Sequence, residues 1–544
     1  MVLARLIEAL SRPAAYPYPV ERVEVCQTHI SVVFLAGPCA YKIKKAVDLG
    51  FLDFTDLARR RHFCEEEVRL NRRLAAEVYH GVVPVTQERD QVSFDGAGAV
   101  VEWAVKMQRL PADATLLDWL HRGAIDGAIV EKLAHRVAAF HGQADAGDHI
   151  AAFGRHEIVA ANARENFKQS APQVDATVST PVFHRLQLLT EAALNRLQPL
   201  IDRRALRGVP RDTHGDLHLE HVYFFPERQP PADLVIIDCI EFNERFRFSD
   251  PVADMAFLFM DLAFHGRRDL ARAFADAYFH ASGDQEGRAL LAYYTAYRAI
   301  VRAKVEGLKA AETEVPPTEQ ARALAQARAH WLLALAELEE RGRKPCVVLV
   351  GGLPGSGKST LAQGLAAQAG FTVIRSDVVR KELVGTEPSG LTTGGGLYTR
   401  EWTDRTYAEC LRRVNLLLFD GGRALVDASF MAEGWRHAFL DAAAHWGVPA
   451  VFFVCRSDPE AVRQRLLTRR GDPSDADWSI HQLIAERWED PGPETNKMTL
   501  DIWNSGTVQQ AIQSALEHLH MLDLYADGES ISSRSATVSA VKSP

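Results

Sequence analysis

The chain has 544 residues, of which 47% are hydrophobic and 24% charged, so a fibrous or wholly disordered protein is excluded. This length predicts two or three domains. A formal net charge of −9 leaves no general basic field for binding nucleic acid without sequence preference. Seven scattered cysteines, odd in number and never in a CxxC pair, argue against a disulfide framework and for a reducing compartment.

Targeting and membrane signals are weak in this sequence. No apolar run approaches the ~20 residues of a spanning helix, and the most apolar stretch, 253–264, carries Asp254 and Asp261. The first ten residues are interrupted by Arg5 and Glu8 and lack the unbroken apolar core of a signal peptide. We therefore expect a cytoplasmic protein with no membrane partner.

The N-terminal half mixes strand-like and helical patterns. The expected elements are strands over 20–48, a helix over 57–74, a strand pair over 95–109, helices over 112–207, short strands around 221–225 and 232–238, and helices over 251–341. Gly37-Pro38 and the proline-rich stretch 226–232 mark turns. This order predicts an α+β domain over 1–315, followed by a helical connector over 316–344.

From residue 346 onward, strand-like runs rich in β-branched residues alternate with helical stretches. The runs cover 346–352, 373–377, 424–429 and 450–455. Such alternation predicts an α/β domain with a doubly wound parallel sheet, here over 345–524. The remaining residues, 525–544, include almost no large apolar side chain, which predicts a disordered tail.

A phosphate-binding motif follows the first of these runs. The sequence from Gly352 to Ser359 fits G-x-x-x-x-G-K-[ST], directly after a strand and before a helix. Glycines allow backbone N–H groups to curl around a phosphate without Cβ clashes. Lys358 would contact the β- and γ-phosphates, and the Ser359 hydroxyl would hold Mg²⁺. The candidate nucleotide-binding residues are Gly352, Leu353, Pro354, Gly355, Ser356, Gly357, Lys358, Ser359 and Thr360.

Charged residues after the motif indicate a kinase rather than another P-loop protein. Asp377 ends the second run and can accept a proton from an acceptor hydroxyl, while Arg380 can bind an anion of the acceptor. Asp427 ends the third run and is placed like a carboxylate that holds Mg²⁺ through water. Further along, a helix carries Arg465, Arg469 and Arg470, and we expect these arginines to form a lid over the phosphates.

Residues 345–500 resemble the small P-loop kinases that include polynucleotide 5′-kinase, zeta toxins, gluconate kinase and chloramphenicol phosphotransferase. The segments that carry the resemblance are GLPGSGKST, S-D-x-x-R over 376–380, VDASF, and RLLTRRGDPSDA over 465–476. The resemblance implies transfer of a phosphoryl group from ATP to a hydroxyl. In the polynucleotide kinase branch the D-x-x-R pair provides the base and a phosphate-binding arginine, which would be Asp377 and Arg380.

A second set of kinase-type residues lies in the N-terminal half. Asp216 is the third residue of the His-Gly-Asp sequence at 214–216, and Asp238 ends a short strand 22 positions later. A catalytic loop with one Asp, followed by a hairpin with a second, is how a protein-kinase-like site places a base and a metal carboxylate. Upstream, Lys42 or its rival Lys44 could pair with Glu67 and bind the α- and β-phosphates.

Residues 20–310 resemble the aminoglycoside phosphotransferase and choline kinase family, which implies a bilobal protein-kinase-like fold. On that resemblance Asp216 is the base, Asp238 a Mg²⁺ ligand, and Glu241 a possible second carboxylate. The run over 238–262 resembles a bacterial group in which such a domain precedes a P-loop kinase. One departure is that His221 stands where the pattern H-G-D-x-x-x-x-N has a metal-binding Asn, and imidazole is a poorer Mg²⁺ ligand than an amide oxygen.

The leading hypothesis is a bifunctional phosphotransferase that uses ATP and Mg²⁺ and acts on a hydroxyl acceptor. One alternative is a polynucleotide 5′-hydroxyl kinase or nucleotide-sugar kinase in the P-loop domain, with the N-terminal domain as a nucleotide-sensing regulator. Nucleic acid is a possible partner but not the favoured one, because the chain is acidic and has no aromatic-basic stripe. The acceptor and the oligomeric state do not follow from the sequence.

Overall fold

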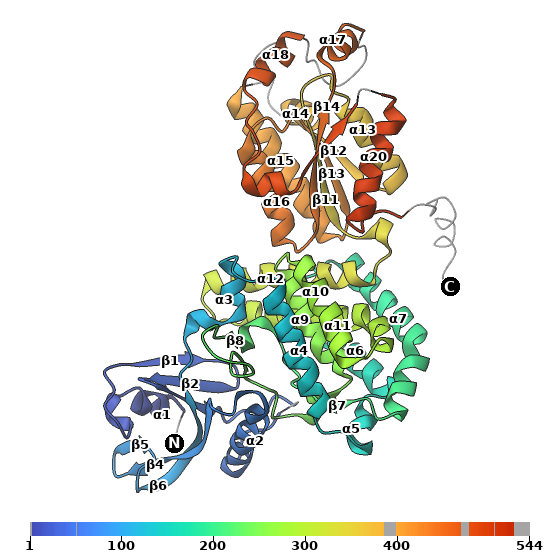
Figure 1. Ribbon diagram of the computed structural model, residues 1–544. Helices are drawn as coiled ribbons and strands as arrows, with labels where there is room; N and C mark the ends of the chain where they lie inside the picture. Colours follow the sequence, from blue (N-terminus) through green and yellow to red (C-terminus); the bar gives the residue numbers. More distant parts are fainter. Residues whose placement is uncertain (1–2, 51, 386–398, 469–477, 505, 527–544) are drawn as a thin grey trace, which may run out of the picture. The chain divides into compact units, whose positions relative to one another are not determined.

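The computed structural model describes residues 3–50, 52–385, 399–468, 478–504 and 506–526 (Figure 1). Arg469, Arg470 and nearly all of the predicted tail lie outside these residues. The chain divides into two compact units, one formed by Met1–Asn162 with Leu194–Arg298 and the other by Ala163–Ala193 with Ala299–Pro544. Among the described helices, none combines the length and apolarity that crossing a membrane requires.

The first unit contains a six-stranded antiparallel sheet with the strand order β1-β2-β3-β6-β4-β5. Its strands are β1 (Val23–Gln27), β2 (Ser31–Ala36), β3 (Cys39–Lys44), β4 (Tyr79–Glu88), β5 (Gln91–Phe94) and β6 (Ala99–Gln108). The sequence did not predict β4, because Gly81 and Pro84 interrupt its apolar alternation. Pairing with β5 and β6 nevertheless keeps this segment extended.

The two faces of this sheet pack against different helices. Tyr41 and Ile43 of β3 belong to the cluster formed with α1 (Leu3–Leu10), whereas α2 (Leu57–Ala75) covers the opposite face. Successive side chains of a strand point to opposite faces. Lys42 and Lys44 therefore both point toward α2, where each contacts Glu67.

A mainly helical region completes the first unit. Its elements are α3 (Leu116–His121), α4 (Gly127–Gln143), α5 (Asp148–Phe153), α8 (Glu244–Arg247), α9 (Pro251–Phe264) and α10 (Arg268–Ser282), with the strand pairs β7 (Arg211–Asp212) with β10 (Phe248–Ser249) and β8 (Val222–Phe224) with β9 (Leu234–Ile236). Helix α9 is almost wholly buried, and α10 packs against both α4 and α9. The loop between β7 and β8 carries Asp216, and Asp238 follows β9.

Four long helices lie wholly or partly in the second unit. They are α6 (His156–Ser170), α7 (Thr180–Leu206), α11 (Leu291–Ala311) and α12 (Pro317–Leu338), of which the first three have residues in both units. Trp331 of α12 is buried against the rings of Phe167 and Phe183. The predicted connector is therefore mostly one helix with a packed core face.

The second unit also contains a five-stranded parallel sheet with the order β12-β13-β11-β14-β15. Its strands are β11 (Cys346–Gly351), β12 (Thr372–Arg375), β13 (Arg423–Asp427), β14 (Ala450–Arg456) and β15 (Thr499–Trp503). The helices are α13 (Lys358–Ala369), α14 (Ser376–Gly385), α15 (Arg400–Phe419), α16 (Glu433–His445), α17 (Pro459–Thr468), α18 (Trp478–Glu486), α19 (Pro493–Lys497) and α20 (Val508–Met521).

Helices cover both faces of this sheet, with α13 and α20 on one side and α15 and α16 on the other (Figure 1). The central strand β11 is fully buried, as its run of β-branched residues predicts. The predicted doubly wound parallel sheet is confirmed. Because all five strands run in one direction, the segments that follow them gather at a single edge of the sheet.

The end of the described chain is part of this core. Leu524 is fully buried among residues of α13 and α20, and its carbonyl oxygen accepts a hydrogen bond from Arg423 at 2.8 Å. Leu524→Ala should lower the free energy of unfolding by about 2–5 kcal/mol, as cavity-forming substitutions do. Chemical denaturation measures this loss. Leu522→Ala is the control, because Leu522 is exposed and its truncation should cost little.

Candidate functional site

The loop between β11 and α13 has the backbone that the phosphate-binding motif requires. Gly352, Gly355 and Gly357 have φ angles of 131°, 81° and 95°, which favour glycine. A Cβ at Gly357 would lie 2.0 Å from Asn504 Nδ2, and one at Gly352 would lie 2.6 Å from the carbonyl oxygen of Cys455. The motif glycines are therefore needed both for conformation and for close packing.

Polar groups of this loop suit a phosphate ligand. The Nζ of Lys358 donates a hydrogen bond to the carbonyl oxygen of Leu353 at 2.9 Å. Within the described residues, the buried Oγ of Ser356 has no hydrogen-bond partner. A buried hydroxyl without a partner is costly in a folded protein. The glycine-lined loop, this hydroxyl and the first turn of α13 together fit a phosphate group.

The two proposed Mg²⁺ ligands of this domain are joined by Arg375. Its Nη2 donates to Ser359 Oγ at 3.1 Å, and its Nε lies 3.2 Å from Asp427 Oδ2. Burial raises the pKa of Asp427, although Lys358, Ser359 and Arg375 oppose the rise. A hydroxyl and a carboxylate oxygen are suitable donors for Mg²⁺. The sequence analysis did not single out Arg375, although it is the last residue of β12, two positions before Asp377.

Asp377 and Arg380 lie together at the start of α14. The Nη1 of Arg380 donates to Asp377 Oδ1 at 3.1 Å, and the arginine is buried whereas the aspartate is half-buried. This contact is local, since the two residues are three positions apart on one helix. The arrangement places a carboxylate and a cation at the edge of the sheet where the glycine-rich loop lies.

Of the predicted lid arginines, only Arg465 lies within the described residues, where it contacts the glycine-rich loop region. Its Nη1 lies 3.0 Å from Ser457 Oγ, and its Nη2 donates to the carbonyl oxygen of Asn504 at 3.1 Å. Asn504 in turn donates from Nδ2 to the carbonyl oxygen of Ser356 at 3.1 Å. The sequence analysis missed Asn504, whose position directly after the last strand of a parallel sheet was the available signal.

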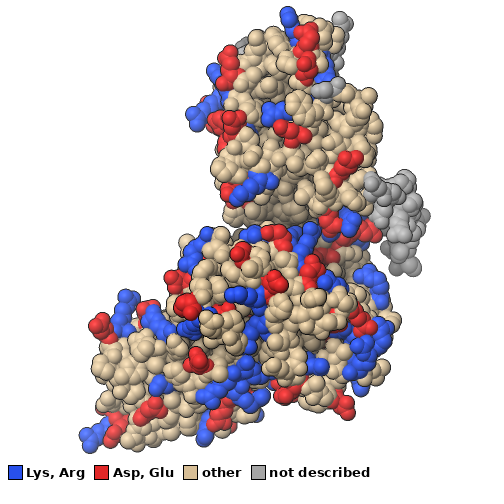
Figure 2. Space-filling model, viewed as in Figure 1, with Lys and Arg blue, Asp and Glu red and all other residues tan. Residues whose placement is uncertain are grey.

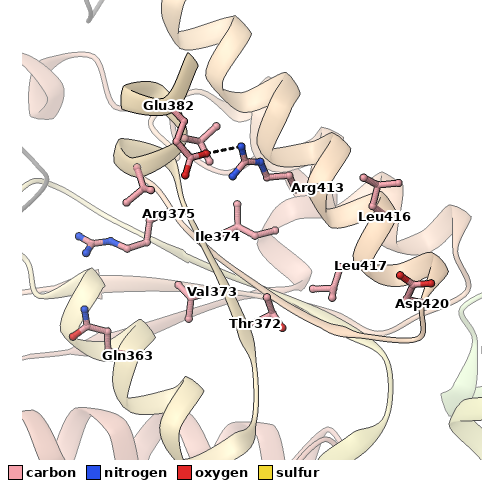
Figure 3. A pocket seen from close by; sticks show the side chains of 12 residues that line it. Gln363, Thr372, Val373, Ile374, Arg375, Glu382, Arg413, Leu416, Leu417 and Asp420 are labelled. Atoms are coloured by element: carbon pink, nitrogen blue, oxygen red, sulfur yellow. Dashed lines mark hydrogen bonds and ion pairs between the residues drawn. The ribbon is translucent and has the colours of Figure 1, made fainter. Parts of the chain in front are cut away.

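A hollow of about 670 Å³ lies beside β12, the edge strand of the sheet (Figure 3). It is lined by the strand and by residues of α13, α14 and α15, among them Arg413, which forms an ion pair with Glu382 at 2.6 Å. Val378 and Val379 line it, whereas Asp377 does not. The proposed base therefore does not line this hollow, although its neighbours Arg375 and Val378 do.

In the first unit, buried Asp254 of α9 holds the loop that carries Asp216. Its Oδ2 accepts from the backbone N–H of His214 at 3.0 Å, and its Oδ1 accepts from that of Gly215 at 2.8 Å. His141 Nε2 lies 3.0 Å from Oδ2. Burial alone would raise the pKa of Asp254, but the contacts with His141, His214 and Arg298 lower it to about 2. The sequence analysis did not identify this anchoring role.

Lys42, Lys44 and Glu67 meet between the sheet and α2, as the sequence predicted. Glu67 lies 3.0 Å from Lys42 Nζ and 2.7 Å from Lys44 Nζ. Lys42 also contacts Asp238 Oδ1 at 2.6 Å, whereas the fully buried Lys44 pairs with Glu241. Burial alone would raise the pKa of Asp238, but Lys42 and His221 lower it. Of the two rival lysines, Lys42 is therefore the one that reaches the predicted metal carboxylate.

Asp216, His218 and His221 form a cluster next to Asp238. Lys42 contacts Oδ1 of Asp238, whereas His221 of this cluster faces Oδ2. Candidate metal-binding atoms of these three residues all lie within 4.8 Å of one another. His221 Nδ1 is 2.9 Å from the carbonyl oxygen of Asp216, and its Nε2 is 3.6 Å from Asp238 Oδ2. Burial lowers the pKa of His221, and nearby His218 adds to this effect. His218, which the sequence analysis did not assign to a metal, belongs to the cluster.

Comparison with known proteins gives matches for both parts of the chain. Residues 347–491 match the family model described as an AAA domain. A Mycobacterium tuberculosis protein named Rv2004c is 33% identical over 475 residues, which cover 86% of this chain and 90% of that protein. That protein is described as uncharacterized.

Two solved structures are also similar to parts of the chain. A gluconokinase from Sinorhizobium meliloti is 20% identical and covers 33% of this chain and 93% of its own, with a TM-score of 0.26. A GDP complex of aminoglycoside 2′-phosphotransferase-IIIa is 15% identical and covers 60% of this chain and 98% of its own, with a TM-score of 0.38.

The anchor at Asp254 predicts a specific acid sensitivity. Its pKa is about 2 in the folded chain, against about 3.9 in an unfolded chain. The stabilisation, about 2–3 kcal/mol, should be complete above about pH 4 and be lost as the pH falls toward 2. The free energy of unfolding of the Asp254→Asn variant should therefore be lower than that of the wild type at neutral pH. It should also decline less steeply as the pH falls from 4 toward 2.

Asp276→Asn is the matched control, because Asp276 is an exposed aspartate on neighbouring α10. It should retain both the wild-type stability at neutral pH and the wild-type acid slope. An Asp254→Asn variant with an unchanged slope would show that the carboxylate charge does not hold the loop.

Proposed function

The chain belongs to the same family as the mycobacterial protein Rv2004c, and we propose that it is a bifunctional phosphotransferase that moves the γ-phosphoryl group of ATP to hydroxyl acceptors. The observation that carries the proposal is the glycine-rich loop after β11, with Lys358 inside it and with Ser359 and Asp427 beside it. A phosphate cradle next to two oxygen ligands is the arrangement that phosphoryl transfer with Mg²⁺ requires.

In the P-loop domain, each residue has a defined part in the proposed reaction. Lys358 and the loop N–H groups bind the phosphates, and the oxygens of Ser359 and Asp427 hold Mg²⁺, which supplies positive charge to the transferring group. Asp377 accepts the proton of the acceptor hydroxyl while the new O–P bond forms and the bond to ADP breaks. Arg380 holds Asp377 in place, and Arg465 supports the loop from behind.

In the N-terminal domain, the proposed site is built around Asp216 and Asp238. Lys42 contacts Asp238 and Glu67 and is the proposed ligand of the nucleotide phosphates. Asp216 is the proposed acceptor base, and Asp238 with His221 the proposed metal ligands. The loop geometry supports this proposal, because Asp254 accepts hydrogen bonds from the backbone N–H groups of His214 and Gly215, the two residues that precede Asp216.

Small hydroxyl compounds are the acceptors we favour. On the face shown in Figure 2, Lys and Arg side chains are interspersed with Asp and Glu, and the net charge of the chain is −9. Both features disfavour a long polyanion as substrate. The acceptor panel should therefore contain sugars, aminoglycosides and nucleotide sugars, with 5′-hydroxyl oligonucleotides as the nucleic-acid arm.

Lys358→Ala and Asp216→Asn should separate the two activities. Transfer of labelled phosphate from ATP to this panel is measured for the wild type, each variant and the double variant. Lys358→Ala should abolish the products of the P-loop domain because the lysine is proposed to bind the phosphates. Asp216→Asn should slow formation of the N-terminal domain's products by about 10²–10⁴-fold, because the amide cannot accept the hydroxyl proton. The exposed Lys497→Ala is the control and should retain both. Any product that the double variant forms at the wild-type rate would contradict the assignment.

Asp377→Asn should slow transfer by the P-loop domain by about 10²–10⁴-fold, because the amide cannot accept the hydroxyl proton. Nucleotide affinity, measured by calorimetry, should change little, since Asp377 is the proposed base for the acceptor and not a proposed phosphate ligand. Asp441→Asn, at an exposed aspartate, is the matched control. Normal transfer by Asp377→Asn would mean that Asp377 serves only as the partner of Arg380.

A further inference from the structure

Two imidazoles and one carboxylate meet in the N-terminal site, where candidate metal-binding atoms of Asp216, His218 and His221 all lie within 4.8 Å of one another, and Asp238 lies beside His221. The rings of His218 and His221 have centroids 3.9 Å apart, and His218 Nε2 lies 3.6 Å from Asp216 Oδ2. His221 Nε2 lies 3.6 Å from Asp238 Oδ2. His218 is buried, and the other three residues are half-buried. A hard-ion site built only from oxygen atoms would not contain this pair of rings.

The hydrogen bond of His221 fixes which of its nitrogens can bind a metal. Its Nδ1 is 2.9 Å from the carbonyl oxygen of Asp216, which can only accept, so Nδ1 carries the proton. In the neutral ring, Nε2 then keeps its lone pair, on the side of the ring that faces Asp238. A backbone carbonyl that orients the ring in this way is the usual partner of a metal-binding histidine.

The separations suit donors that share one ion better than they suit direct contacts. Distances of 3.6 Å between His218 and Asp216, and between His221 and Asp238, are too long for hydrogen bonds. Metal–nitrogen and metal–oxygen bonds are about 2.1 Å long, so two donors on one ion lie about 3–4 Å apart. The two oxygens of Asp238 have different neighbours: Lys42 contacts Oδ1, and His221 faces Oδ2.

We propose that Asp216, His218 and His221, with Asp238 beside His221, form a mixed imidazole–carboxylate centre that binds a divalent transition-metal ion such as Mn²⁺ in preference to Mg²⁺. Imidazole suits first-row transition ions, whereas Mg²⁺ prefers oxygen and keeps its water ligands. Only the use of this ion in phosphoryl transfer rests on the function proposed above. The ion site itself stands on the spacing of Asp216, His218 and His221 and on the approach of His221 to Asp238.

The test uses the full chain without nucleotide and with Mn²⁺ as the probe. Pulsed electron paramagnetic resonance detects a directly bound imidazole nitrogen, and calorimetry gives the affinities for Mn²⁺ and Mg²⁺. The wild type should show nitrogen bound to Mn²⁺. The P-loop site cannot produce this signal, because its proposed ligands, Ser359 and Asp427, are oxygen donors.

His221→Asn should lose most of the nitrogen signal and bind Mn²⁺ at least about tenfold more weakly, without a matching loss for Mg²⁺. His218→Asn should reduce the signal in the same direction. His135→Asn is the matched control, since His135 is an exposed histidine of α4 in the same domain, and it should behave as the wild type does. Circular dichroism confirms that each variant is folded.

Two results would overturn the proposal. One is Mn²⁺ bound to the wild type by oxygen alone, a result that does not depend on how any variant folds. The other is a folded His221→Asn variant with unchanged nitrogen signal and Mn²⁺ affinity.

Phosphoryl transfer by Lys358→Ala, assayed with each metal, separates this proposal from the proposed function. A nitrogen signal without transfer would support the metal centre and contradict the proposed N-terminal activity. Transfer with Mg²⁺ and no nitrogen signal would support the proposed N-terminal activity and contradict the metal centre.

Discussion

The pairing of Glu67 with two lysines fixes the geometry of the N-terminal site. A buried carboxylate is stable only when cations and hydrogen bonds compensate the loss of water, and removing one partner typically costs about 3–5 kcal/mol. Glu67 is fully buried, and Lys42 and Lys44 reach it from alternate positions of β3. Because these lysines continue to Asp238 and Glu241, the sheet, α2 and the segment after β9 are joined by one set of charges.

The P-loop domain obeys the same constraint with different residues. Asp427 is buried at the end of β13, and Arg375 from the neighbouring strand lies 3.2 Å from it while also bonding Ser359 at 3.1 Å. Parallel strands bring these side chains to one edge of the sheet, although they lie far apart in the sequence. Arg375 thus holds the Ser359 hydroxyl and the Asp427 carboxylate, which we propose as metal ligands, close to each other.

The sequence predicted best what consecutive residues encode. The glycine-rich loop was predictable because its strand, its turn and the first helical turn adjoin one another. The shared face of the rival lysines Lys42 and Lys44 was predictable because side chains alternate along a strand. Arg375, Asn504 and Asp254 were not predicted, because each contacts a partner that approaches it only in the folded chain. Their partners are 16, 148 and 40 positions away in the sequence, and local sequence patterns do not predict contacts over such separations.

Position 221 shows how one departure from a motif can be accommodated by its surroundings. The motif asparagine has a short side chain with one amide oxygen, whereas the His221 ring extends from the Asp216 carbonyl to within 3.6 Å of Asp238. One nitrogen therefore serves the loop and the other faces the carboxylate. The second imidazole, from His218, is packed against the first at 3.9 Å. Both rings belong to one short loop that Asp254 holds, so the backbone that presents the proposed base also presents the nitrogen donors. A substitution that shifts this backbone would therefore alter both proton acceptance by Asp216 and metal binding by the two imidazoles.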